Sequence, residues 1–146
     1  MMPTDQGRNH AFNMKKFAQY GLGLFYLAGG PLIHLYCLNF NRQIYNSMAD
    51  TAWLPYQTLW TEIIVPFLVP SVTLLIVFEV VAGLLMLSHF PKIAARGQLL
   101  GVLFNLCLVP FWWVPFNSPN LLLAALHGLL FWAEWHREQE RFLVSS

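Results

Sequence analysis

One long apolar segment with a single acid inside it most constrains what this chain can fold into. The segment runs from Val65 to Ser88, and its acid is Glu79. Seventeen of the residues from Ile63 to Leu87 are Leu, Ile, Val or Phe. At roughly −0.3 to −0.6 kcal/mol each, they outweigh the roughly +3 kcal/mol that an acid costs at the centre of a membrane span. The segment is therefore predicted to cross a membrane with the Glu79 carboxyl turned toward a neighbouring helix or a cavity, which makes it a functional candidate.

The rest of the chain has the same apolar character. Of its residues, 57% are hydrophobic and only 10% are charged, whereas a soluble domain carries about 25% charged residues. Uncharged stretches cover 17–41, 63–78 and 97–133, and long uncharged apolar runs are typical of spanning helices. The net charge of +1, with no basic patch, argues against binding of nucleic acid. The two cysteines lie in separate apolar segments with no C-x-x-C pair, which argues against a thiol–disulfide enzyme and a cysteine-based metal site.

The predicted fold is all-α, a polytopic membrane protein with four transmembrane helices in one bundle. A polar N-terminal segment, 1–16, precedes a membrane domain of residues 17–135, and a polar tail, 136–146, follows it. The spans are expected at 17–37, 63–88, 97–114 and 120–135. An outer loop, 38–62, separates the first two and holds a short interfacial helix around 41–52. The last span is the shortest, because its purely apolar part has only some 13 residues for a hydrocarbon core of about 30 Å.

The distribution of Lys and Arg predicts how the bundle is oriented. If the N-terminus lies inside, seven of the eight Lys and Arg residues fall on the inner side and only Arg42 falls on the outer side. Positively charged loops stay on the cytoplasmic side of a membrane. Both termini are therefore expected to face the cytoplasm.

Polar residues recur at intervals of seven, which puts them on one helix face because two turns take about 7.2 residues. These stripes are Asn120, His127 and Glu134 in one helix, Gln98, Asn105 and Trp112 in another, and Tyr20, Leu27 and His34 in the first. The motif Gly97-x-x-x-Gly101 adds a small-residue surface for close helix contact, within the bundle or in a dimer.

Counting residues from the helix ends predicts which polar groups meet. Glu79 lies roughly 13 Å and Asn105 roughly 12 Å from the inner surface, and His127 lies roughly 10 Å from the outer one. These three residues are expected to share a polar site in the middle of the membrane. His34 lies closer to the outer loop, near Glu62.

The role of each residue in this site has more than one interpretation. Glu79 is either a proton-accepting or ligand-orienting carboxyl, or a polar contact that holds helices together. His127 could exchange a proton, donate to a quinone or ligate haem, although a structural hydrogen bond to Glu79 or Asn105 is the more common role. Ligation of one haem by His34 and His127 is disfavoured because their estimated depths differ.

The candidate ligand-binding residues are Asn105, His34, Tyr26 and Trp112. Each also has a structural alternative: helix contact for Asn105, charge pairing in the outer loop for His34, packing for Tyr26, and a lipid-interface position for Trp112. No metal site is predicted.

One stretch of the sequence resembles a known family. Residues 78–87 (FEVVAGLLML), followed by Arg96-Gly97, resemble the bacterial DoxX/DoxD-like family, which has an E-x-x-x-G-L-L pattern late in its second helix. The proline-bearing start of that helix (VPFLVPSVTLL), the small-residue run 26–30 (YLAGG) and residues 120–128 are also similar. The cations usual after the small-residue run are missing, and His34 stands nearby instead.

The resemblance implies a four-helix, multi-pass protein of the bacterial inner membrane. Some members of the family are membrane subunits of quinone-linked oxidation of reduced sulfur, and others are linked to oxidative-stress complexes. The implied function is a membrane subunit or quinone-proximal module of such a redox system, with quinone as the cofactor. Its partners would be the lipid bilayer, redox subunits and a second copy of the chain. In that role Glu79 accepts a proton or binds a quinone carbonyl, and His127 exchanges the matching proton.

Two other functions stay open. A weaker similarity to the EXPERA group implies a binding protein or isomerase for an isoprenoid or sterol-like ligand, with Glu79 inside its pocket. The third alternative is a structural membrane anchor in which Glu79 is fully paired. The sequence leaves open whether the protein is an enzyme.

Overall fold

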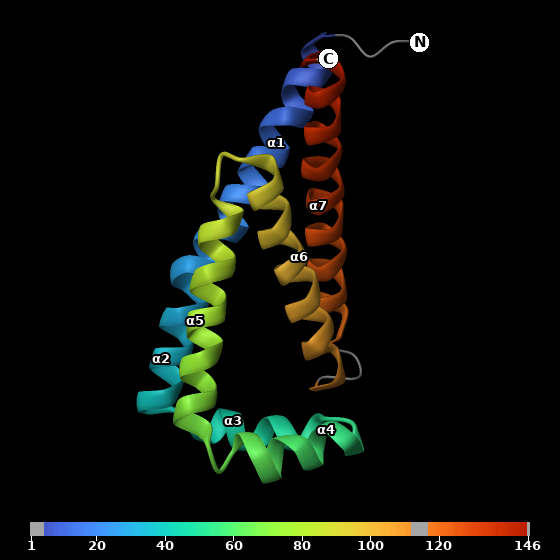
Figure 1. The fold of residues 1–146 in the computed structure, drawn as a ribbon. Helices are drawn as coiled ribbons and strands as arrows, with labels where there is room; N and C mark the ends of the chain where they lie inside the picture. Colours follow the sequence, from blue (N-terminus) through green and yellow to red (C-terminus); the bar gives the residue numbers. More distant parts are fainter. Residues whose placement is uncertain (1–4, 112–116, 146) are drawn as a thin grey trace.

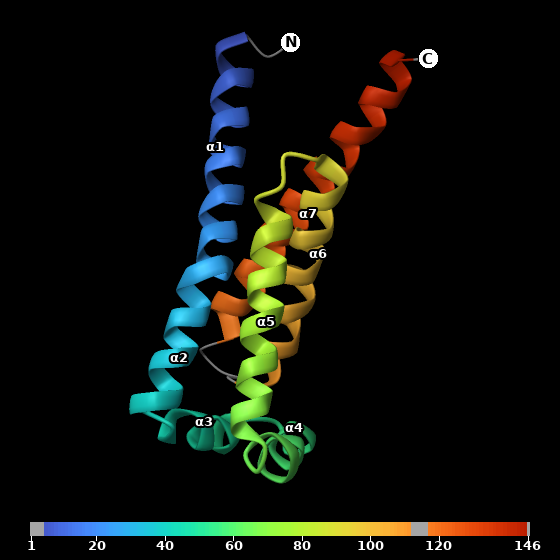
Figure 2. The same ribbon diagram turned by 60° about the vertical axis from the view of Figure 1, so that its left-hand side comes forward.

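Four helical columns run side by side, and a layer of short helices crosses one end of them (Figure 1). The computed structural model describes the backbone of residues 5–111 and 117–145 and the side chains of 14–111 and 119–137. Within these ranges every regular element is helical and none is a strand, which confirms the all-α class. The N- and C-termini lie at the same end, opposite the layer of short helices (Figures 1 and 2).

The first column is one continuous helical path made of α1 (Asp5–Leu24), the π-helical turn η1 (Phe25–Gly29) and α2 (Gly30–Phe40). It extends about twelve residues further toward the N-terminus than the expected span 17–37. The wide turn η1 has a physical cause in Pro31, which has no N–H and whose ring would clash with the carbonyl of residue 27 in a regular helix. A π turn directly before the proline relieves that clash, and the N–H of Gly30 bonds instead to the Phe25 carbonyl.

The second column begins after a similar break. The π-helical turn η3 (Trp60–Ile64) is followed by Pro66 and by a non-helical residue, Phe67, before α5 (Leu68–Met86) starts. Proline explains the break as it does in the first column. The break therefore occurs at Pro66, and Pro70 lies in the first turn of α5.

The third column is α6 (Pro91–Leu108) with a short 3₁₀ turn, η4 (Val109–Phe111). It starts six residues before the expected position 97, because Pro91 takes the first helical position, where a missing N–H costs nothing. Gly97 lies against the C-terminal end of α5, since a Cβ there would lie 2.5 Å from the backbone nitrogen of Met86. The two helices therefore pack closely at the end that holds the termini.

The fourth column, α7 (Asn117–Ser145), packs along α6 and continues well beyond the expected end at residue 135, into the charged tail. Gly101 makes this contact possible, since a Cβ there would lie 2.6 Å from the ring of His127. Both glycines of the Gly97-x-x-x-Gly101 motif are thus used inside the bundle.

The layer of short helices consists of α3 (Gln43–Ser47), the 3₁₀ turn η2 (Met48–Thr51) and α4 (Leu54–Leu59). It is tied to the end of the third column by two hydrogen bonds. The Trp53 N–H donates to the Pro110 carbonyl at 3.1 Å, and the Thr51 hydroxyl donates to the Phe111 carbonyl at 2.6 Å. The α3–α4 layer therefore closes one end of the bundle.

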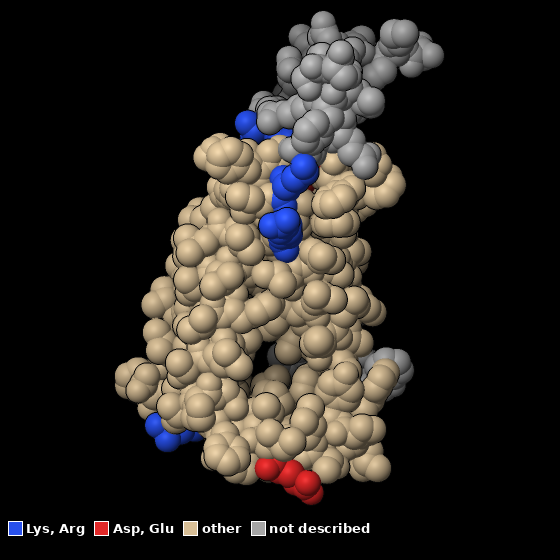
Figure 3. Space-filling model, viewed as in Figure 1, with Lys and Arg blue, Asp and Glu red and all other residues tan. Residues whose placement is uncertain are grey.

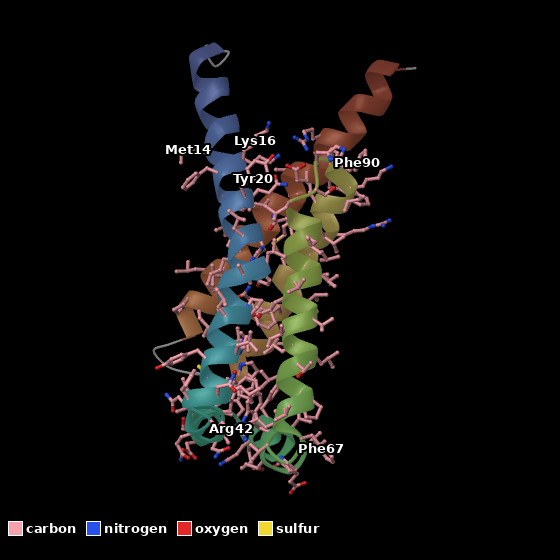
Figure 4. The ribbon with its side chains drawn as sticks, turned by 90° about the vertical axis from the view of Figure 1, so that its left-hand side faces the viewer. Met14, Lys16, Tyr20, Arg42, Phe67 and Phe90 are labelled. Carbon is pink, nitrogen blue, oxygen red and sulfur yellow. The ribbon has the colours of Figure 1, made fainter. Side chains whose placement is uncertain are left out.

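Three helical stretches are long and apolar enough to cross a membrane: Met14–Phe40, Leu68–Met86 and Pro91–Phe111. Large apolar side chains point outward along them, among them Leu74, which is 71% exposed. On the face in Figure 3 the charged side chains lie toward the two ends, and a broad uncharged band separates them. Figure 4 shows Lys16 and Phe90 at one end, and Arg42 and Phe67 at the other. The chain thus has the helix lengths and surface of a membrane protein.

Candidate functional site

The Glu79 carboxyl is buried between the first and second columns. It is 3% exposed, and its Oε1 atom lies 3.3 Å from Nε2 of His34 on α2. Gly30 makes room for it, because a Cβ there would lie 2.6 Å from Oε1 and 2.7 Å from Oε2. One turn further along α5, Gly83 lets the backbones meet, since a Cβ there would lie 2.6 Å from the backbone nitrogen of Leu27. The acid is therefore held inside the protein, as the sequence predicts, and its direct partner is on the first column.

A chain of polar contacts leads from this pair to the α3–α4 layer. The Nδ1 atom of His34 lies 2.8 Å from the hydroxyl of Tyr45 on α3, and the two rings stack. The Trp60 indole N–H donates to the Tyr45 carbonyl at 2.6 Å and so fixes α3 over the end of the bundle. Both ring nitrogens of His34 therefore have a polar neighbour.

A second polar group lies between η1 and the other two columns. The Asn105 amide on α6 donates to the Tyr26 hydroxyl at 3.0 Å and to the Gly101 carbonyl at 2.9 Å. Tyr26 also contacts the ring of His127 edge-on, with centroids 5.4 Å apart, and it is close enough to Glu79 to interact with it electrostatically. Tyr26 therefore connects the α2–α5 side of the site with the α6–α7 side.

His127 is fully buried at 0% exposure, and it pairs with Gln98 on α6. Its Nδ1 atom lies 2.7 Å from the Gln98 carbonyl oxygen Oε1. Because an amide oxygen only accepts, Nδ1 carries the proton, and in a neutral ring Nε2 is then an acceptor.

Several buried polar atoms of these residues lack a partner within the described part of the chain. They are Oε2 of Glu79, Nε2 of Gln98 and Nε2 of His127. A buried polar group without a hydrogen bond costs about 1–3 kcal/mol, and buried polar atoms are normally paired with protein or ordered water. Two of them belong to side chains that neighbour Tyr26, Glu79 and His127, and the third belongs to Gln98, the partner of His127. Together they indicate a place where a polar ligand group or water binds.

The molecule is hollowed between α5 and α6. Because α5 and α6 are closest at the turn between them, they diverge toward the α3–α4 layer, as Figure 1 shows. The space-filling view in Figure 3 shows an opening between the two columns, just above that layer. Such an opening faces the side of the bundle, not its end.

A separate ion cluster ties the first and fourth columns together near the termini. Glu134 on α7 is 1% exposed, and its Oε1 lies 3.0 Å from Nζ of Lys15 on α1. Its Oε2 lies 2.6 Å from an Arg137 nitrogen, as an ion pair without hydrogen-bond geometry. Nearby, the Gln19 amide donates to the Met86 carbonyl at 2.8 Å.

The structure brings most of the predicted residues together, but with different partners. The two polar stripes of α6 and α7 do face the interior, because Gln98, Asn105, Asn120, His127 and Glu134 are all buried. His34, which was expected near the outer loop, reaches both that loop and Glu79. Tyr26 reaches the polar cluster instead of only packing. Trp112 lies outside the described residues.

Four residues of these contacts were missing from the predicted site. Gln98 could have been found, since it lies seven residues before Asn105 on the same stripe. The sequence predicts that Tyr45 lies in the outer loop in the same region as His34, but the contact between the two side chains depends on how α3 folds back. The Lys15–Glu134 pair depends on α1 beginning before residue 17, so that Lys15 is part of the helix.

Among the described residues, no group of three or more His, Cys, Asp or Glu side chains could hold a metal ion. Comparison of the sequence and structure with family models, curated proteins and solved structures gives no match. Function is therefore inferred below from the geometry of the buried polar groups.

Proposed function

We propose that this protein spans the bacterial inner membrane four times with both termini in the cytoplasm, and that it binds a quinone inside the bundle as the membrane module of a redox or oxidative-stress system. The observation that carries the proposal is the set of unpartnered buried atoms of Glu79 and His127, which both neighbour Tyr26, and of Gln98, which binds His127. A quinone is a flat apolar ring with two carbonyl oxygens, and it travels within the bilayer. The carboxyl, amide and imidazole groups found here can bind such a carbonyl, and the carboxyl and imidazole can also exchange protons.

Two features support the four-span topology. The fourth column, α7, packs along α6 and presents exposed leucines, of which Leu122 and Leu129 are each 69% exposed. An outward apolar face of this kind is expected next to lipid. Seven of the eight Lys and Arg residues belong to the N-terminal segment, the α5–α6 turn and start of α6, or the C-terminal tail, all on the expected cytoplasmic side.

The side opening supports a ligand that arrives from the bilayer. It lies between α5 and α6, which are both apolar on their outer faces. A membrane-soluble molecule can enter there without crossing a polar surface, whereas a water-soluble one cannot. The aromatic pair of Phe78 and Phe104, with centroids 5.7 Å apart, bridges the same two helices and offers a flat apolar wall.

The chemistry of the site follows from its donors and acceptors. When the Glu79 proton is on Oε2, the carboxyl donates to a carbonyl oxygen, and His34 in the tautomer that carries its proton on Nε2 donates to Oε1. The Gln98 amide is a second donor, and Nε2 of His127 accepts a proton from a quinol hydroxyl. These residues bind the head group and take or supply protons, and the electrons are exchanged with a partner redox subunit.

Binding of a short-chain benzoquinone to the purified protein in lipid nanodiscs tests the proposal. Quenching of tryptophan fluorescence is expected to saturate, and an alkylbenzene with the same tail but no carbonyls is expected not to compete. Glu79→Leu removes the donor of the carboxyl, and His127→Phe removes the acceptor. Each is expected to weaken binding about tenfold, the equivalent of about 1.4 kcal/mol, a typical value for one hydrogen bond.

Glu62→Leu is the matched control, because Glu62 is an exposed carboxyl on η3. Its affinity for the quinone is expected to equal that of the wild type. Equal binding of the alkylbenzene, or unchanged affinity in both Glu79→Leu and His127→Phe, would contradict the proposed function.

A further inference from the structure

We infer that Glu79 exchanges its proton with the α3–α4 face of the membrane, through His34 and Tyr45, and not with the face that carries the termini. The geometry that carries this inference is the unbroken line of contacts from the carboxyl to α3. Oε1 of Glu79 lies 3.3 Å from His34 Nε2, and His34 Nδ1 lies 2.8 Å from the Tyr45 hydroxyl. The inference depends on the proposed membrane topology but not on the quinone.

The line ends beneath the exposed surface of the α3–α4 layer. Tyr45 is itself buried at 4% exposure, but its neighbours in α3, Ile44 and Asn46, are exposed. His34 retains 20% side-chain exposure. The phenol therefore belongs to a helix whose adjacent side chains reach the surface at this end.

In the opposite direction, toward the termini, the described residues form no continuous line of hydrogen bonds from Glu79. A cluster of Tyr26, Ala82 and Met86 lies there, covered by Leu22, Leu100 and Phe104. Ala82 and Met86 are completely buried at 0% exposure. The buried amides on that side bind elsewhere, since Gln19 donates to the Met86 carbonyl and Gln98 pairs with His127. Within the described residues, no hydrogen bond or ion pair joins Glu79 to the Lys15–Glu134 pair at that end.

The proton transfer balances without any other reactant than water. The Tyr45 hydroxyl lies 3.4 Å from the His34 carbonyl and can donate to it, so it accepts from Nδ1–H of His34. Nε2 is then the acceptor for the Glu79 proton. When that proton moves to Nε2, the Nδ1 proton passes to the Tyr45 oxygen, and the phenol proton passes to water. Reprotonation runs in reverse, and no electrons move.

Titratable side chains of η1, α2 and α7 lie around the line from Glu79 through His34 to Tyr45. Tyr26 of η1 and Cys37 of α2 lie closest to the Glu79–Tyr45 region, and His127 of α7 lies behind Tyr26. Among the described residues, His34 is the one whose ring contacts both the Glu79 carboxyl and the Tyr45 hydroxyl. A variant at His34 or Tyr45 is therefore expected to break the exchange, whereas the other groups leave it intact.

Labelling with dicyclohexylcarbodiimide tests the inference, because this membrane-permeant reagent adds to protonated carboxyls. The protein is reconstituted in vesicles of known orientation, and the adduct on Glu79 is measured by mass spectrometry while the pH of one compartment is raised from about 4 to about 8, a range that includes the ordinary pKa values of glutamate and histidine side chains. Labelling is expected to fall severalfold when the α3–α4 side is raised, and to stay constant when the other side is raised. Glu79→Gln gives the background.

Tyr45→Phe and His34→Phe are expected to abolish the response to the α3–α4 side. Tyr36→Phe is the matched control, because Tyr36 is exposed on the same helix as His34 and outside the line. Labelling that follows the terminal side, or that follows both sides equally, would overturn the inference, as would an unchanged response in Tyr45→Phe. Quinone affinity is measured separately, so a failure of quinone binding leaves this result interpretable.

Discussion

Glu79 is paired with His34, and not with His127, across the contact between the second and first columns, at 3.3 Å from Oε1 to Nε2. Because the acid is the most costly residue to place within a span, this contact decides how the bundle closes. It also leaves one carboxyl oxygen, Oε2, without a partner in the described part of the chain. The proposed ligand site and the proposed proton route both begin at this carboxyl.

Loss of the His34 partner is expected to destabilise the bundle. His34→Ala leaves both carboxyl oxygens of Glu79 buried without a donor, at a cost of about 1–3 kcal/mol. Thermal or SDS-induced unfolding in detergent micelles measures the change. His89→Ala is the control, because His89 is exposed in the α5–α6 turn, and its effect is expected to stay within about 0.5 kcal/mol. Equal effects of the two substitutions would show that the pair does not hold the helices together.

The close approach of the Glu79 carboxyl to Gly30 gives a second prediction. Gly30→Ala places a methyl group 2.6 Å from Oε1 of Glu79, so the carboxyl or the helix must move, at a cost of about 1–3 kcal/mol. The matched control is Gly21→Ala on the same column, which meets nothing within 4 Å and is expected to be neutral or stabilising. The same unfolding assay separates them, and a neutral Gly30→Ala would contradict the packing described.

The contact between α6 and α7 gives a third prediction. Gly101→Ala puts a methyl group 2.6 Å from the His127 ring. We expect it to weaken the fold by about 1–3 kcal/mol and to disturb the His127–Gln98 bond. Gly128→Ala, where a Cβ meets nothing within 4 Å, is the control. The nitrogen NMR shifts of the His127 ring report on that bond, and they should change in the first variant only.

The seven-residue spacing predicted which side chains face the bundle interior, and it did so for physical reasons. A helix repeats its face every two turns, so Gln98 with Asn105, and His127 with Glu134, necessarily point the same way. A buried polar stripe in one helix then requires a neighbour. The buried faces of α6 and α7, and the burial of Glu79, could therefore be predicted from the sequence.

The partners on other helices could not be predicted in the same way. Depth was counted from expected helix ends, but α1 starts before residue 17 and α6 starts at Pro91. The π turn η1 before Pro31 then changes which residues of the first column face α5. His34 reaches Glu79 as a result, and no count along straight helices could show it. The position of Tyr45 depends on the path of the α3–α4 layer. The short helices of this layer have no periodic pattern in the sequence from which their path could be predicted.

A fourth prediction concerns pH. Burial first, and then the nearby Cys37 and Glu79 side chains, raise the pKa of the Tyr45 phenol to about 12, compared with about 10 in an unfolded chain. Because the pKa is higher in the folded state, the associated stability is fully present below about pH 10 and is lost as the pH rises toward 12. Unfolding measured across this range should show that loss, and Tyr45→Phe should reduce it. An identical pH dependence in the variant would contradict the burial of the phenol.

The distance between the Glu79 carboxyl and the His34 ring, measured in a lipid bilayer, tests the central claim most directly. Solid-state NMR can recouple ¹³Cδ of Glu79 with ¹⁵Nε2 of His34 in a selectively labelled sample. The account predicts strong dephasing, as expected for groups whose oxygen and nitrogen lie 3.3 Å apart. No measurable dephasing between the two, in a folded sample, would mean that the acid is held elsewhere, and it would contradict both the site and the proton route.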